Sequence, residues 1–150
     1  MNDKRNGQRY AWRQGNIGRL LNIAVQRFER RVLQLMGEAG YDGLSLSHMA
    51  VTRNLDVRGT RATEIAKRAG ITKQFVGELI GQLEDVGLLE RIPDPDDGRA
   101  RITRFTPAGF AWLEAFGIAV KHAEQEMKKE LGAELFNAIK QALDRYGSSE

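Results

Sequence analysis

The residues best placed to do chemistry lie on a predicted helix over residues 73–86. At about 100° per residue, its apolar side gathers Phe75, Val76, Leu79, Ile80 and Leu83, and its opposite side presents Lys73, Gln74, Gly77, Glu78 and Gly81. A glycine inside a helix costs roughly 1 kcal/mol relative to alanine. Two glycines on the exposed side therefore predict that another surface comes close to the backbone. The alternative is a solvated face that tolerates glycine.

The wall of a DNA major groove is one surface that could approach the helix in this way. Gln74 can pair with the edge of an adenine, and Lys73 and Thr72 suit a guanine edge or a phosphate. The turn before this helix and the hairpin after it favour contact with DNA over simple solvation.

A second group of residues lies at the tip of a predicted β-hairpin, whose strands cover residues 88–92 and 99–105. Three aspartates in this tip would repel phosphates unless they orient the neighbouring arginines. We therefore expect Asp97 to brace Arg99 or Arg101, so that one guanidinium enters a narrow minor groove. The alternative is a solvated loop with local salt bridges worth ~0–1 kcal/mol.

Regular elements must hold this helix and hairpin in place. Apolar residues recur at helical spacing in six stretches, and Asn16, Ser45, Thr72 and Thr106 are predicted caps. The fold class is all-α with a small β wing, and the middle of the chain is a winged helix-turn-helix. The predicted segments are a flexible basic arm over 1–15, a helix over 16–43, the winged helix-turn-helix over 44–106, and a long helix with a last helix over 107–150.

Composition limits the classes of protein to which the chain can belong. It has 150 residues, 41% of them hydrophobic, which suits one folded domain. The absence of cysteine excludes a disulfide scaffold, a thiolate zinc site and a cysteine redox switch. No apolar run approaches the ~18 residues of a membrane span, and no secretory signal follows the first methionine. We expect a cytoplasmic protein without membrane contact.

The net charge of +3 is concentrated at the start of the chain. Residues 1–35 carry eight basic residues against two acidic ones, a balance of +6, whereas residues 58–104 balance at only +1. A basic segment suits a polyanionic partner, although solvated basic tails are also common.

Enzyme chemistry finds little support in the sequence. It has no phosphate loop, no serine-hydrolase elbow and no zinc-protease motif. His48 and His122 lack a second ligand at metal spacing, so we expect a capping or surface role and no metal site. The sequence predicts neither a catalytic residue nor a cofactor.

The stretch TEIAKRAGITKQFVGELIGQLEDVGLLERIPDPDDGRARITRFT, residues 63–106, resembles the DNA reader of MarR-family transcriptional regulators. The matching motifs are the E-I-A helix, the I-T-K-Q start of the recognition helix, the L-E-x-x-G-L-L-E-R bridge and the D-P-x-D-G-R-A wing. The flanking helices extend the likeness over about residues 16–146. The resemblance implies a homodimer joined by the first and last two helices, with each reader on half of a pseudo-palindromic operator. The simplest activity is then repression by occupying promoter DNA.

The resemblance also implies which residues contact DNA. Direct readout would be thin, because Gly77, Glu78 and Gly81 stand where the family often has hydroxylated or basic residues. Specificity would then depend partly on DNA shape. The expected contacts are Thr72, Lys73, Gln74 and Gly77 on the helix, Arg99 and Arg101 on the wing with Asp97 as brace, and Arg58, Arg61 and Lys67 or Arg68 on phosphates.

A site for a small aromatic or phenolic effector is a further implication of the resemblance. The site would lie between the dimer helices and the reader. Its candidate lining residues are Met49, Trp112 and Phe116, with Arg27 or Arg31 as the anion partner. The alternative is ordinary core packing, because an aromatic stripe at helical spacing is more often core than pocket.

The competing function is a winged-helix module that binds another protein. Phe75 and the two exposed glycines would then receive a partner helix, and the nearly neutral reader leaves that option open. Salt dependence separates the two functions, because DNA affinity falls steeply with salt and an apolar protein contact does not.

Overall fold

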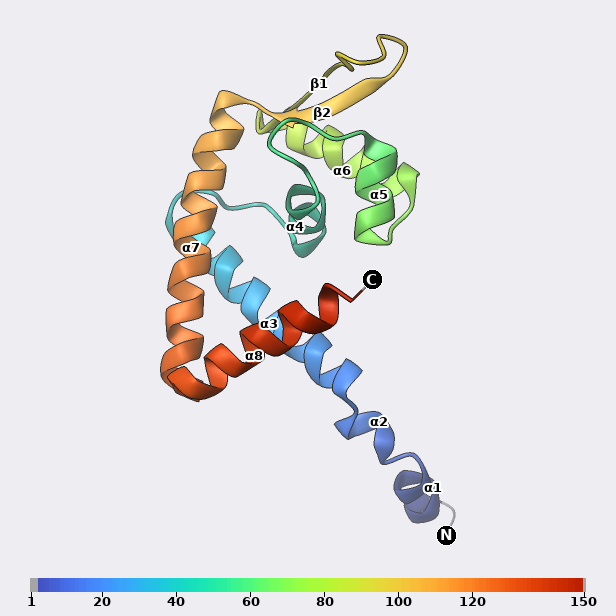
Figure 1. Cartoon of the computed structure of the whole chain (residues 1–150), viewed down its shortest axis with the longest axis vertical. Coiled ribbons are helices and arrows are strands. Elements are labelled where there is room, and N and C mark those ends of the chain that lie inside the picture. Colours follow the sequence, from blue (N-terminus) through green and yellow to red (C-terminus); the bar gives the residue numbers. More distant parts are fainter. Residues whose placement is uncertain (1–2, 150) are drawn as a thin grey trace.

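The computed structural model describes residues 3–149, which form a mostly helical body with a small antiparallel hairpin (Figure 1). The elements in chain order are α1 (Asp3–Arg9), α2 (Trp12–Gly15), α3 (Ile17–Glu38), α4 (Leu46–Arg53), α5 (Ala62–Ala69), α6 (Lys73–Asp85), β1 (Leu89–Pro93), β2 (Arg101–Phe105), α7 (Pro107–Leu131) and α8 (Ala133–Gly147). The predicted winged helix-turn-helix, with long helices on either side, is confirmed.

The predicted caps begin the helices as expected. The Asn16 side chain accepts the N–H of Arg19 at 3.0 Å, and Thr106 Oγ1 accepts the N–H of Gly109 at 3.0 Å. Ser45 makes a reciprocal capping box, because its hydroxyl accepts the N–H of His48 while His48 Nδ1 accepts the N–H of Ser45 at 2.9 Å. His48 is therefore a capping residue, as predicted.

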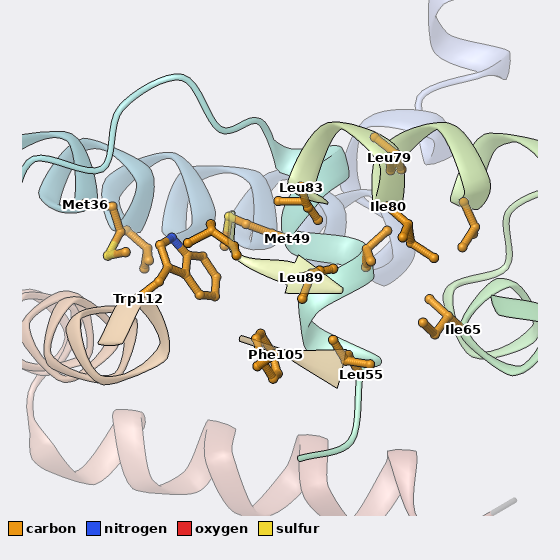
Figure 2. Close-up of a cluster of buried hydrophobic side chains, with 14 of the residues drawn as sticks. Met36, Met49, Leu55, Ile65, Leu79, Ile80, Leu83, Leu89, Phe105 and Trp112 are labelled. Carbon is orange, nitrogen blue, oxygen red and sulfur yellow. The ribbon is translucent and has the colours of Figure 1, made fainter. Parts of the chain in front are cut away.

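One hydrophobic core joins the reader to the long helices (Figure 2). Leucine and isoleucine from the inner side of α6 meet residues of α5, the hairpin and α4, and Trp112 of α7 closes the other end of the cluster. The core side chains labelled in Figure 2 are Met36, Met49, Leu55, Ile65, Leu79, Ile80, Leu83, Leu89, Phe105 and Trp112. Burial of these side chains fixes the direction in which α6 presents its polar side.

The hairpin is attached to both the reader and α7. Its strands pair with Leu89 opposite Phe105 and Ile92 opposite Ile102. The connector before α5 adds a single antiparallel bridge from Thr60 to Thr103. At the start of α7, a Cβ on Gly109 would collide with the Leu88 carbonyl, so glycine lets α7 pack directly on the hairpin.

Three predictions made from periodicity are wrong in detail. Residues 3–15, predicted to lack regular structure, form α1 and α2, because Lys, Arg and Gln favour helix even without an apolar face. Phe75, placed on the inner side of α6, is 40% exposed, because it lies at the edge of that side. The spacing of Met49, Val51 and Leu55 predicts that all three lie on the second helix, but Leu55 follows the end of α4 and is buried there.

A large apolar surface is left uncovered on the long helices. Ile17, Leu20, Ile23 and Val25 in the N-terminal half of α3 are each half exposed or more. This half of α3 extends away from the reader, with α2 and α1 beyond it (Figure 1). The large exposed apolar residues of α8 are Leu135, Leu143 and Tyr146.

None of the helices in residues 3–149 is long and apolar enough to cross a membrane.

Candidate nucleic-acid interface

The turn between α5 and α6 sets the recognition helix at the surface. Gly70 ends α5 in the left-handed conformation, with φ 67°, where a side chain would be strained. Thr72 then caps α6 by accepting the N–H of Phe75 at 3.1 Å. Thr72, Lys73 and Gln74 are all exposed at this end of the helix. Three of the four predicted helix contacts thus occupy adjacent positions at the N-terminus of α6.

The glycines of α6 lie on an open surface that the side chain of Arg91 partly covers. A Cβ added to Gly77 would meet nothing within 4 Å, whereas one on Gly81 would lie 4.0 Å from Arg91 Nη2. Arg91 reaches over from β1, donates to the Gly77 carbonyl at 3.1 Å and pairs with Glu84 at 2.9 Å. The side of α6 near Gly77 is therefore accessible, and Arg91 is a basic residue at this surface that the sequence analysis missed.

The wing tip holds its most exposed arginine against an aspartate. Arg99 has a side chain that is 95% exposed, and its Nε lies 3.3 Å from Asp97 Oδ1. The same carboxylate oxygen accepts the backbone N–H of Arg99 at 3.1 Å. Arg101 is exposed at the start of β2. The predicted pairing of Asp97 with Arg99 is present in the structure.

A second aspartate fixes the base of the wing to the reader. Asp94 is buried, and its carboxylate accepts the N–H of Asp96 at 2.9 Å and Arg61 Nε at 2.8 Å. The N–H of Asp96 and the Arg61 guanidinium hold the pKa of Asp94 below its ordinary value. Arg61, expected to contact phosphate, thus also joins the start of α5 to the wing. The sequence analysis did not predict this role of Asp94. Aspartate side chains nevertheless often accept the backbone N–H two residues later in a turn, as Asp94 does here.

The other expected phosphate contacts fall into two groups. Arg58 and Lys67 are exposed, with their charge open to solvent. Arg68 is held by Asp56 at 3.0 Å and by Glu64 at 3.2 Å, which raise the pKa of its guanidinium further. The Arg68 guanidinium is therefore already engaged within the chain, where it joins α5 to the connector before it.

His48 connects the cap of α4 to the recognition helix. Its Nδ1 accepts the N–H of Ser45, so Nε2 carries the proton and donates to Gln82 Oε1 at 2.7 Å. His122 lies one helical turn from Glu126, at 3.1 Å. Within residues 3–149 no three His, Asp or Glu side chains gather as a metal site would require.

The residues proposed to line an effector site occupy the junction of α4, α3 and α7. Met49 and Trp112 are buried, and the Trp112 and Phe116 rings stack with centroids 5.0 Å apart. Trp112 Nε1 is buried without a hydrogen-bond partner in the described part of the chain. Arg27 and Arg31 each bind an α7 carboxylate through two nitrogens.

Arg27 pairs with Glu130 at 2.6 Å, and Arg31 pairs with Glu126 at 2.7 Å. An anionic effector would therefore compete with two carboxylates already in place. A cavity of about 400 Å³ lies elsewhere, between the loop before α4, the end of α6 and the start of α7, with Tyr41, Leu44, Val86, Leu88, Ala108 and Ala111 among its lining residues.

Known proteins resemble the reader and wing in both sequence and fold. Residues 42–100 match the model of the MarR family. The HTH-type transcriptional repressor Rv2887 of Mycobacterium tuberculosis is 27% identical over 107 residues, which cover 71% of this chain and 77% of that repressor.

Solved structures extend the likeness to the flanking helices. Wild-type MarR from E. coli, in its apo form, has a TM-score of 0.72 at 20% identity and covers 88% of this chain and 97% of its own. The repressor CouR, bound to a 23-mer DNA duplex, has a TM-score of 0.68 at 24% identity over 88% of this chain and 92% of its own. CouR from Rhodococcus jostii RHA1, bound to p-coumaroyl-CoA, has a TM-score of 0.71 at 20% identity over 90% and 94%.

The matching family model covers the reader and wing, and the shared fold covers the long helices as well. The chain is therefore similar to MarR-family regulators in its reader and wing, and it shares the fold of MarR and CouR along the flanking helices.

Proposed function

We propose that this chain is a homodimer that binds duplex DNA sequence-specifically at a pseudo-palindromic operator and represses transcription by occupying it. The observation that carries the proposal is the surface formed by the open N-terminal turns of α6 and the wing tip, where Asp97 holds an exposed Arg99. Thr72, Lys73 and Gln74 can reach base edges or phosphates in the major groove. CouR, which shares the fold, was solved on duplex DNA.

The dimer is supported by the apolar surface of α3 and α8. A monomer that leaves Ile17 and Leu20 of α3 and Tyr146 of α8 exposed would carry an unusually large uncovered apolar surface. A second copy of the chain would cover this patch, and the two-fold arrangement would present two recognition helices. This arrangement matches the two half-sites of a palindrome.

We further propose that a small aromatic effector releases the operator by binding near Met49, Trp112 and Phe116. The buried Trp112 Nε1, which has no partner in the described residues, supplies a donor for such a ligand. CouR bound to p-coumaroyl-CoA supports an aromatic ligand for a protein of this fold. Arg27 or Arg31 would bind the anion only by leaving its glutamate.

A winged-helix module for protein binding is the second candidate, because Phe75 is an exposed aromatic residue on the recognition helix. Such a module would bind without a steep dependence on salt.

Selection of bound duplexes from a random pool, followed by titration at two salt concentrations, tests the proposed function. We expect enrichment of a pseudo-palindrome with half-sites about one helical turn apart. Affinity should fall with salt with a slope of about −0.9 per neutralised phosphate. Binding without an enriched sequence would contradict an operator, and no binding to any duplex would favour the protein-binding module.

A further inference from the structure

Phe75 occupies an unusual position for an aromatic side chain. It is the third residue of α6, and its backbone N–H is fixed by the hydrogen bond to Thr72 Oγ1. The other apolar residues of the first three turns, Val76, Leu79 and Ile80, are buried, yet Phe75 is exposed. On the helical wheel it lies about 60° from Glu78 and about 100° from Gln74. Its ring is therefore next to the positions proposed to face DNA.

The surroundings of Phe75 offer little to a protein partner. An amphipathic partner helix needs a continuous apolar stripe, but the exposed residues next to Phe75 on the helical wheel are the polar Gln74 and Glu78. Further along the same flank, Gln82 is already held by His48 at 2.7 Å. The next large exposed apolar residue, Val86, follows the end of α6. A single exposed ring with no other large exposed apolar residue on α6 fits a small apolar group.

The major groove contains one such group. Among the base edges, only thymine presents an apolar substituent there, the 5-methyl group, and phenylalanine is a side chain that contacts it. The rest of this surface has few groups that read bases, because positions 77 and 81 are glycine. The open space at Gly77 also lets the groove come close to the first two turns.

We propose that Phe75 packs against the 5-methyl group of a thymine in each half-site and is a specificity-determining residue of this regulator. The proposal rests on the proposed function, because it requires α6 to lie in a major groove. It predicts that the operator contains one thymine per half-site whose methyl group matters to binding. The loss of one buried methyl group corresponds to a fall in affinity of about fourfold.

Uracil provides a direct test, because it pairs like thymine and lacks the methyl group. Each thymine of the selected operator is replaced by uracil, one at a time, and the dissociation constant is measured for the wild-type protein and for Phe75→Ala. We expect one position per half-site at which uracil weakens wild-type binding about fourfold. At that position Phe75→Ala should bind the thymine and uracil duplexes equally.

Phe110→Ala is the matched control, since Phe110 of α7 is also 40% exposed but lies outside the proposed DNA surface. It should keep the full sensitivity to uracil. Phe75→Leu retains an apolar side chain and should keep part of the sensitivity to uracil. This variant separates loss of the thymine contact from loss of the fold.

Two results would overturn the proposal while leaving the proposed function in place. One is wild-type binding that no uracil substitution weakens. The other is a uracil effect that is the same in the wild-type protein and in Phe75→Ala. Failure of the wild-type protein to bind any duplex would instead overturn the proposed function, and the Phe75 proposal with it.

Discussion

At the scale of single residues, the wing shows how acidic side chains can serve a surface that is proposed to face DNA. Asp97 holds the Arg99 guanidinium at the tip, and Asp94 holds Arg61 at the base. In each pair the carboxylate limits the freedom of an arginine before any ligand arrives. An arginine ordered in advance loses less conformational entropy on binding than a free one.

Arg99→Ala tests the role of the wing tip. We expect operator affinity to fall by about 1–3 kcal/mol, because the variant loses a guanidinium placed to contact a base edge. Fluorescence titration gives the affinity, and sedimentation should show an unchanged oligomeric state. Lys129→Ala, near the end of α7, removes one exposed positive charge away from the reader and is the control. Unchanged affinity in Arg99→Ala would remove the wing tip from the mechanism.

Gly77→Ala separates stability from DNA binding. The added Cβ meets nothing within 4 Å, so the free energy of unfolding should rise by about 0.5–1 kcal/mol, as alanine favours helix. Operator affinity should nevertheless fall, because the methyl group keeps the groove wall from the backbone.

Gly37→Ala on α3 also meets nothing within 4 Å and is the control, with the same gain in stability and no change in affinity. Urea unfolding and titration of both variants provide the comparison. A Gly77→Ala variant that binds DNA as well as wild type would show that the helix backbone is not approached closely.

Spacing and residue type predicted the exposed side of α6 and the Asp97–Arg99 pair, because both depend on neighbours in the sequence. The pairs Asp94–Arg61 and Arg91–Gly77 were not predicted. Each joins residues that the hairpin brings together from 14 or more positions apart. Phe75 was misplaced because helical periodicity alone cannot show how far the core extends around a helix.

At the scale of elements, two ion pairs join α3 to α7. Arg31 holds the pKa of Glu126 down to about 2, with His122 as a weaker contributor. Arg27 lowers the pKa of Glu130 in the same way. These ion pairs fix the position of α3, which carries exposed apolar residues, relative to α7, which follows the wing. Binding of an anion to either arginine would release that contact.

The lowered pKa of Glu126 predicts a dependence of stability on pH. A carboxylate with a lower pKa in the folded state stabilises the fold above its ordinary pKa of 4.5, and the effect disappears as pH falls through about 2. Glu126→Gln should therefore be less stable than wild type at pH 6, and the difference should shrink between pH 4.5 and pH 2.

Urea unfolding over this pH range measures the difference. Glu114→Gln, on the exposed side of α7 and outside the ion pairs of the described residues, is the control. A difference in the free energy of unfolding between wild type and Glu126→Gln that stays constant from pH 6 to pH 2 would contradict a stabilising ionised pair.

At the scale of the whole molecule, the uncovered surface of α3 and α8 is the feature most in need of a partner. The helical spacing of apolar residues predicts this helix from residue 16 onward, but Ile17 and Leu20 of α3 are half exposed or more in the single chain. In the proposed dimer a second copy would bury these residues, and a single sequence cannot distinguish such burial from burial in its own core.

Leu20→Asp tests this surface. We expect a monomer in sedimentation at concentrations where wild type is dimeric, because the aspartate would be buried without a partner at the interface. Operator binding should fall with it, since two readers are no longer linked. Val57→Asp changes an exposed apolar residue of the connector before α5 and should leave the dimer intact. A dimeric Leu20→Asp would place the interface elsewhere.

The most direct test of the central claim, one dimer reading two half-sites, is the effect of half-site spacing. Five base pairs inserted between the half-sites of the selected operator rotate one half-site by about half a turn of the helix. We expect affinity to fall toward the non-specific level, by about 10³-fold or more, while the sequence of each half-site is unchanged. Equal affinity for the two duplexes would show that each reader binds alone, and would contradict the proposed dimeric recognition.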